Sequence, residues 1–277
     1  MTLIADQLVA IAAAAEDTRK AIYDRGAILP PGSGLAAFAP ALRQAKPVPD
    51  PPPDWPDLDV GFTPGTMRGL VMIQADDAEN WVSLSATAGG SYTVDWGDGT
   101  SETIADAATA THQYAWATAG PVCSEGYKTA IVTVSAATPI TTLDLVKLPA
   151  AWVDADRNWS IWLDLLIDLP ACTSLLIGQD RTVVKHQRLR QAHIRRWGVT
   201  NASNMFAFCT SLTRVPELGV RYSISFQRTG LRRLALNDLF AGLGTAAGAQ
   251  TVTISETPGR LTCDKTIATA KGWTVAT

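Results

Sequence analysis

The residues best suited to bind a charged ligand form a basic stretch near position 190. Its candidate binding residues are Lys185, Arg188, Arg190, Arg195, Arg196 and Trp197, continued by Arg232 and Arg233. Arginine presents a planar fork of donors that matches phosphate and carboxylate groups. The stretch therefore predicts a face that binds lipopolysaccharide phosphate, an acidic polysaccharide or an acidic protein. The alternative is a solvated face, kept basic for solubility or for salt bridges to the acidic front half of the chain.

Residues that could perform catalysis are sparse. His186 and His193 are seven positions apart in the basic stretch, where a surface pair is expected rather than a metal site. Carboxylates occur in two close pairs, Asp154 with Asp156 and Asp164 with Asp168. A glycosidase would need such a pair in a cleft at a defined separation, which sequence does not reveal. Motifs of serine hydrolases, zinc proteases and phosphate-binding loops are missing, and no CxxC pair suggests zinc. We expect no enzyme activity and no metal site.

Charge and hydropathy exclude further classes. The net charge is −3, which argues against a nucleic-acid binder recognised by bulk charge. Residues 1–180 hold 9 Lys and Arg against 22 Asp and Glu, whereas residues 181–277 hold 14 against 4. This asymmetry predicts different partners at the two ends, or head-to-tail contact between copies. No apolar run approaches the roughly 20 residues of a membrane span, and the apolar start lacks the positive region of a signal peptide.

Residues 1–46 are predicted to form a helical anchor or oligomerisation segment. A heptad-like seam of apolar side chains runs along it, formed by Ile4, Leu8, Ile11, Ala15 and Ile22. Such spacing keeps one face toward a partner helix. The segment could equally pack on the domains that follow. A proline-rich linker is expected over residues 47–66, because six of the 16 prolines fall in residues 47–56 and favour an extended spacer.

Residues 67–137 are predicted to form a β-sandwich. Residues 81–87, 91–96 and 129–135 alternate apolar and polar side chains or are rich in β-branched residues, and Gly89-Gly90 supplies a turn. Short strands with glycine-rich turns are typical of small sandwiches. In the turn that follows residues 91–96, Gly-Asp-Gly permits positive φ and Asp98 can bond its own backbone.

A motif within this segment resembles the polycystic-kidney-disease (PKD) domain, an immunoglobulin-like sandwich. Its residues are Trp96, Gly97, Asp98 and Gly99, followed later by His112 and Tyr114. The resemblance covers about 70 residues and implies that these side chains are structural, with His112 as a hydrogen-bonding residue. The remaining alternative for Asp95 and Asp98 is a calcium site, because calcium takes oxygen ligands. No other cofactor is expected.

Residues 138–277 carry a loose repeat. Short strands of one type are expected at residues 142–145, 173–177, 210–215, 229–234 and 251–254. The run from Asn204 to Pro216 resembles the BspA-like leucine-rich repeat, in which such units stack into a solenoid. A cap is predicted to follow, with a strand at residues 234–236, helices at residues 237–243 and 264–271, and a strand at residues 273–275. The expected fold class is therefore mainly β and multidomain: a helical segment, a PKD-like sandwich and a short, irregular leucine-rich-repeat-type solenoid.

The order of these parts is similar to that of tail-associated proteins of tailed bacteriophages. The resemblance implies a structural protein of a tail fibre, tail tip or baseplate, made in the host cytoplasm and located in the virion tail. Its expected partners are other tail or baseplate subunits through the N-terminal segment, a host-surface glycan or protein, and copies of itself, with a trimer favoured. No nucleic acid and no membrane insertion are expected. The alternatives are a purely structural virion protein (a connector or decoration) and a bacterial surface adhesin.

Overall fold

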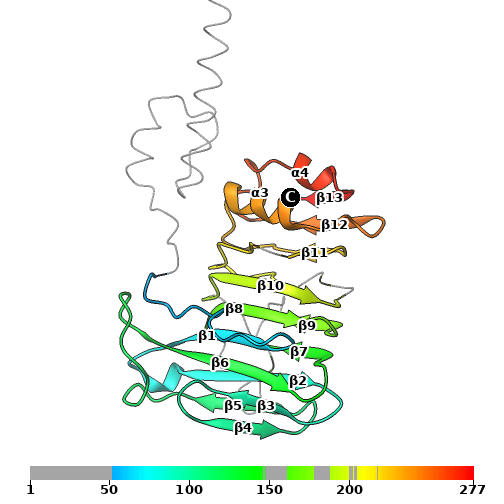
Figure 1. Ribbon diagram of the computed structural model, residues 1–277. Helices are drawn as coiled ribbons and strands as arrows, with labels where there is room; N and C mark the ends of the chain where they lie inside the picture. Colours follow the sequence, from blue (N-terminus) through cyan, green and yellow to red (C-terminus); the bar gives the residue numbers. More distant parts are fainter. Residues whose placement is uncertain are drawn as a thin grey trace, which may run out of the picture.

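The computed structural model describes residues 52–145, 147, 161–177, 188–199, 202, 205–216 and 218–277. Over these ranges the protein is mainly β, as predicted, with strands stacked from the sandwich-like base toward the C-terminus (Figure 1). Among the described helices, none has both the length and the apolar character needed to cross a bilayer.

The largest sheet, called sheet A here, has six strands. Their spatial order is β10 (Gln191–Trp197), β8 (Trp162–Leu169), β1 (Met67–Ile73), β6 (Lys128–Ala136), β3 (Tyr92–Asp95) and β4 (Ser101–Ile104). Neighbours are antiparallel except β10 and β8, which run parallel. Two predicted strands are confirmed in this sheet, since β3 and β6 fall on the segments expected at residues 91–96 and 129–135. The strand expected at residues 81–87 is confirmed in the second sheet.

Two smaller sheets are formed by other described residues. Sheet B consists of β5 (Thr109–Gln113), β2 (Trp81–Thr87), β7 (Thr142–Asp144) and β9 (Ser174–Leu176) in that order. The third sheet is parallel and consists of β11 (Ile224–Ser225), β12 (Gln250–Thr253) and β13 (Trp273–Ala276). We call the stacked segments from β8 to β13 the parallel ladder. Isolated parallel bridges, Gln191 with Arg214 and Ala202 with Ile224, connect its rungs.

The described helices are short. They are η2 (Asp77–Glu79), α3 (Arg233–Gly242) and α4 (Thr266–Thr269). The strand predicted at residues 234–236 is wrong, because these residues form the first turns of α3. Helical spacing explains the difference: Leu236, Leu239 and Phe240 lie on one buried face of α3. The helix predicted at residues 264–271 is confirmed only for the four residues of α4.

The larger of the two hydrophobic clusters among the described residues runs through both predicted domains. Buried side chains form a single cluster that extends from Met67 in β1 to Trp273 in β13. Both sandwich sheets also gain strands from beyond residue 137: β8 pairs with β1 in sheet A, and β7 pairs with β2 in sheet B. The residues on either side of position 137 therefore share sheets as well as a core.

A turn recurs along the parallel ladder. In each copy an apolar residue accepts a backbone hydrogen bond from the residue three positions later. The pairs are Leu169 with Cys172, Phe206 with Cys209, Phe226 with Thr229, and Ile254 with Thr257. Phe206 and Phe226 stack with ring centroids 5.1 Å apart. Equivalent residues thus lie above one another, although the number of residues between them varies.

Two of the predicted repeat strands are wrong. Residues 210–215 form turns with one isolated bridge at Arg214, and residues 229–234 lead into α3. The physical reason is visible at Gly230, where a Cβ atom would lie 2.8 Å from the carbonyl oxygen of Thr210. At Gly230 the backbone lies close to the backbone of the preceding turn at Thr210. This close approach needs a glycine, and the segment does not pair as a strand here.

Residues 52–62, the entry segment, pack on the outer face of sheet A. Leu58 is buried there against Leu70, Leu163 and Leu166 in a second apolar cluster. Arg68 holds the segment by donating hydrogen bonds to the carbonyl oxygens of Leu58, Val60 and Gly61. The spacer expected from the prolines is therefore wrong from residue 52 onward, because these residues turn and pack against the sheet. Residues 47–51 lie outside the described ranges.

Candidate functional site

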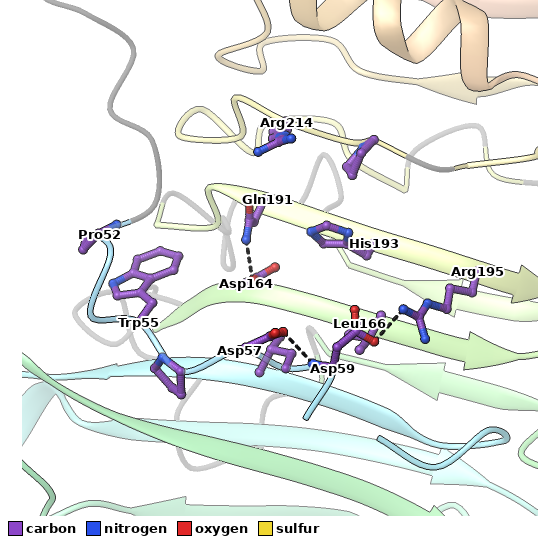
Figure 2. A pocket seen from close by; sticks show the side chains of 13 residues that line it. Pro52, Trp55, Asp57, Asp59, Asp164, Leu166, Gln191, His193, Arg195 and Arg214 are labelled. Atoms are coloured by element: carbon purple, nitrogen blue, oxygen red, sulfur yellow. Dashed lines mark hydrogen bonds and ion pairs between the residues drawn. The ribbon is translucent and has the colours of Figure 1, made fainter. Parts of the chain in front are cut away.

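A polar cleft lies on the outer face of sheet A, where the entry segment meets the parallel ladder. It has a volume of about 400 Å³ and is drawn in Figure 2. Its walls come from four separate stretches of chain: the entry segment, β8, β10 and the turn at residues 214–216. Alternation along the strands explains which side chains reach it. In β10, Ala192 and Ile194 enter the core, whereas Gln191, His193 and Arg195 line the cleft.

Three polar residues of the cleft occupy the same register on successive rungs. Gln191 pairs with Asp164 in the β8–β10 ladder and also forms the parallel bridge to Arg214. Register thereby places the Gln191 amide beside the Asp164 carboxylate, and its Nε2 donates to Oδ2 of Asp164 at 2.5 Å. Figure 2 shows the three side chains rising from β8 to the turn above β10.

Asp164 is the unusual member of this column. Asp164 is only 6 % exposed. Its second carboxylate oxygen, Oδ1, has no hydrogen-bond partner among the described residues. Burial raises its pKa from 3.8 to about 7, although the hydrogen bond from Gln191 acts in the opposite direction. A buried carboxylate with an unsatisfied oxygen costs stability, so the fold alone gives no reason to keep it.

The remaining walls of the cleft combine apolar and charged groups. Trp55, Pro52, Pro56 and Leu166 contribute apolar surface. Asp57 accepts a hydrogen bond from the backbone of Asp59. Asp59 in turn forms an ion pair with Arg195 at 2.5 Å. Acceptors, donors and an aromatic surface therefore converge in one hollow.

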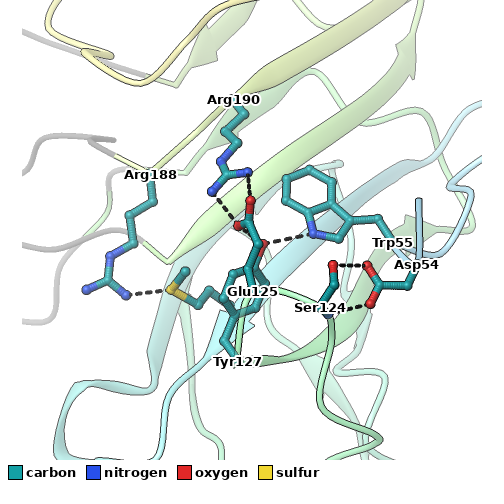
Figure 3. Close-up of polar contacts among 8 residues, drawn as sticks. Asp54, Trp55, Ser124, Glu125, Tyr127, Arg188 and Arg190 are labelled. Atoms are coloured by element: carbon teal, nitrogen blue, oxygen red, sulfur yellow. Dashed lines mark hydrogen bonds and ion pairs between the residues drawn. The ribbon is translucent and has the colours of Figure 1, made fainter. Parts of the chain in front are cut away.

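The arginines of the basic stretch that the structure describes are paired with carboxylates. Arg190 makes a bidentate contact with Glu125, at 2.9 and 2.6 Å. Its guanidinium also lies 5.4 Å from the ring centroid of Trp55, whose indole donates to the hydroxyl of Tyr127. Glu125 accepts from Tyr127 as well, and Figure 3 shows how this network holds the entry segment against sheet A. The Arg190 hydrogen bonds hold the pKa of Glu125 below its ordinary 4.5.

The other described arginines of this stretch behave similarly. The ion pairs are Arg188 with Glu79 at 3.5 Å, Arg195 with Asp59 at 2.5 Å and Arg196 with Asp168 at 2.5 Å. All of these carboxylates belong to the acidic part of the chain, before residue 181. The geometry therefore favours the alternative in which the basic stretch forms salt bridges to the acidic front half.

Other predicted binding residues are placed apart from this cluster. Arg232 precedes α3 and Arg233 begins it, and α3 lies above β11, beside β12 (Figure 1). Trp197 ends β10, and Lys185 lies outside the described residues. The predicted oligomerisation residues also lie outside them, namely Ile4, Leu8, Ile11, Ala15 and Ile22.

The PKD-like motif residues assemble into a compact cluster. The ring of His112 stacks on Trp96 at 4.8 Å between centroids, and its Nε2 lies 2.8 Å from Oδ2 of Asp98. The hydroxyl of Tyr114 donates to the backbone oxygen of Trp96 at 2.8 Å. Gly97 and Gly99 both have positive φ, of 75° and 93°, which the turn requires. These contacts join the turn after β3 to β5 and hold the two sheets together.

Asp95 and Asp98, the residues of the calcium alternative, take part in turn hydrogen bonds. Oδ1 of Asp95 accepts from the amide of Gly97, and Oδ1 of Asp98 accepts from the amide and hydroxyl of Thr100. Partial burial raises the pKa of Asp98, but hydrogen bonds from Thr100 and His112 outweigh it and hold the pKa below 3.8. Across the described ranges, no group of three or more His, Cys, Asp or Glu side chains is arranged to hold a metal ion.

Comparison of the chain with protein-family models, with curated proteins and with solved structures finds no match. The site therefore has to be interpreted from its own geometry. Sequence reasoning named Asp164, but as a possible partner of Asp168, which faces Arg196 outside the cleft. It did not single out Trp55, Gln191 or Arg214 as parts of one site.

Proposed function

We propose that this chain is a structural protein of a bacteriophage tail, associated with a tail fibre, tail tip or baseplate, that displays a host-surface-binding module. The observation that carries the proposal is the Trp96–His112–Asp98 cluster, which fits a PKD-like sandwich as the resemblance implies. The recurring turns of the parallel ladder fit a short, irregular leucine-rich-repeat-type solenoid on top of it. Together these two likenesses match the order of parts in tail-associated proteins.

The shared core suits a display role. A single apolar cluster joins the sandwich to the ladder, so a load applied at one end is transmitted through packed side chains. The outer face of sheet A carries a polar cleft beside this core. A rigid support that carries a polar cleft is an arrangement suited to binding, and we infer no reaction from it.

A purely structural virion protein is the second candidate, and the arginine pairs favour it. Arg190, Arg195 and Arg196 are each engaged with a carboxylate of the same chain, so they hold the fold together. Under this alternative the folded part contacts neighbouring virion subunits and does not bind the host surface.

Immunogold labelling of virions tests the location. Antibodies raised against the purified chain should label the tails of phage particles obtained from the source culture, with pre-immune serum as the control. Binding of fluorescently labelled full-length protein to intact host cells then separates the two candidates, because only the first predicts saturable binding. Tails that remain unlabelled would refute both.

The oligomerisation prediction has its own test. Removal of residues 1–51 should lower the number of protomers per particle, taken as the molar mass from light scattering divided by the mass of one chain, while the folded part stays intact. The deletion stops before Pro52, because Pro52 and Trp55 belong to the packed entry segment. An unchanged number of protomers per particle would show that the N-terminal segment does not assemble the protein.

A further inference from the structure

Asp164 lacks a partner at one oxygen although the rest of its surroundings is well paired. Gln191 satisfies Oδ2, whereas Oδ1 has no partner among the described residues and belongs to a residue that lines the cleft. Buried polar atoms are nearly always hydrogen-bonded in native structures. An orphaned acceptor on a residue that lines a hollow indicates a missing donor. Because Oδ1 itself is covered, a ligand in the cleft reaches it after a small shift of the groups that cover it.

The charges of the cleft favour a neutral ligand. Arg195 is neutralised by Asp59, and the exposed Arg214 stands near Asp57 and Asp164. An anionic ligand would approach the two carboxylates, and a cationic ligand would approach Arg214. Hydroxyl groups avoid both problems, because each can donate to Asp164 or Asp57 and accept from Arg214.

The apolar wall fits the same ligand. Trp55 and the prolines at positions 52 and 56 offer flat, rigid surfaces that lose little entropy on binding. Arg190 covers part of Trp55 and thereby holds its orientation. A volume of about 400 Å³ lies within the usual range for small-ligand sites and gives room for a sugar unit.

We propose that the cleft between the entry segment and the parallel ladder binds a neutral saccharide, with Oδ1 of Asp164 accepting a hydrogen bond from a sugar hydroxyl. Gln191 holds the Asp164 carboxylate in place, Arg214 donates from the rim, and Trp55 supplies an apolar surface. The inference deepens the proposed function, on which it rests, by naming the chemical class of the surface ligand.

Asp164→Asn is the decisive variant. The amide is nearly isosteric and can still accept the hydrogen bond from Gln191, but it turns a donor toward the cleft where the carboxylate had an acceptor. Asp168→Asn is the matched control, since it makes the same change on the same strand outside the cleft. Circular dichroism verifies that both variants are folded.

The experiment measures binding of full-length protein to an array of neutral hexose and N-acetylhexosamine oligosaccharides, followed by calorimetric titration with the best oligosaccharide. We expect saturable binding that Asp164→Asn weakens at least tenfold and Asp168→Asn changes less than twofold. Equal affinity in wild type and Asp164→Asn would overturn the proposal, as would the lack of any wild-type binding.

The outcome stays separable from that of the proposed function. If the antibody labels tails but the protein binds no saccharide, only the proposal that the cleft binds a saccharide is overturned. Saccharide binding that depends on Asp164, in a protein that does not label tails, would overturn only the assignment to a virion.

Discussion

The same substitution, Asp164→Asn, should stabilise the protein at neutral pH. Burial holds the pKa of Asp164 at about 7 in the folded protein, compared with 3.8 when it is exposed. A difference of about 3 units corresponds to about 4 kcal/mol at 1.36 kcal/mol per unit. That is the cost of carrying the charged carboxylate in the fold, and the neutral amide does not incur it.

The direction of the pH dependence follows from proton binding. Between about pH 4 and pH 7 the folded state binds more protons at Asp164 than the unfolded state does. The stability that the protein has with Asp164 protonated is therefore fully present below pH 4. It is lost progressively as the pH rises from about 4 to about 7. Urea unfolding of both proteins at pH 4, 5, 6, 7 and 8 should show that the variant gains about 4 kcal/mol relative to wild type between pH 4 and pH 8, on top of a constant offset from the amide group.

Comparing the two proteins at each pH removes the titration of all other groups. Asp98, for example, has a lowered pKa and destabilises both proteins equally at acidic pH. A difference between wild type and variant that stays constant from pH 4 to pH 8 would refute the reasoning, because Asp164 would then not titrate in that range. A variant less stable at pH 8 would show that the charged form is favoured by a group within the fold.

Two further predictions concern the turn after β3 and the network around Glu125. Gly97→Ala should cost at least about 2 kcal/mol more than Gly99→Ala in chemical denaturation, because both sites have positive φ but only at Gly97 would a Cβ collide with the backbone of Ile131. Equal losses of stability in the two variants would mean that the positive φ, and not the collision with Ile131, sets the cost of adding a Cβ atom. Glu125→Gln should cost about 1 kcal/mol at pH 7, and this loss should fade below pH 4.5, where Glu125 loses its charge in the unfolded and then the folded state. A loss that persists at pH 3 would point to packing instead of the ion pair.

Strands in which apolar and polar side chains alternate could be predicted from the sequence. Strands without this alternation could not. The strands β2, β3 and β6 each have one face toward the core, so their pattern is visible in the sequence. All eight residues of β8 are buried, so no alternation marks the strand, and its two carboxylates suggested a catalytic pair instead. The alternation of Ala192 and Ile194 with polar neighbours was present in β10, but the density of arginine nearby led to the prediction of a binding face.

The cleft could not be predicted for a different reason. Its residues come from four stretches spread between positions 52 and 216, and only the pairing of β8 with β10 brings Asp164 beside Gln191. Pairing register between distant strands is set by the whole core and not by local sequence. The PKD-like motif, in contrast, spans fewer than twenty residues, and its resemblance to a known family pointed to a structural cluster.

The pairing of β1 with β8 also constrains when the protein can fold. Met67 pairs with Ile167, so one edge of β1 has no strand beside it until about 100 more residues have been synthesised. At about 5–20 residues per second, this edge stays open on the ribosome for about 5 to 20 seconds. Long-range pairing of this kind also slows folding after release. Strand β1 is therefore the place where a nascent chain is most exposed to pairing with another copy, and where a chaperone would have most effect.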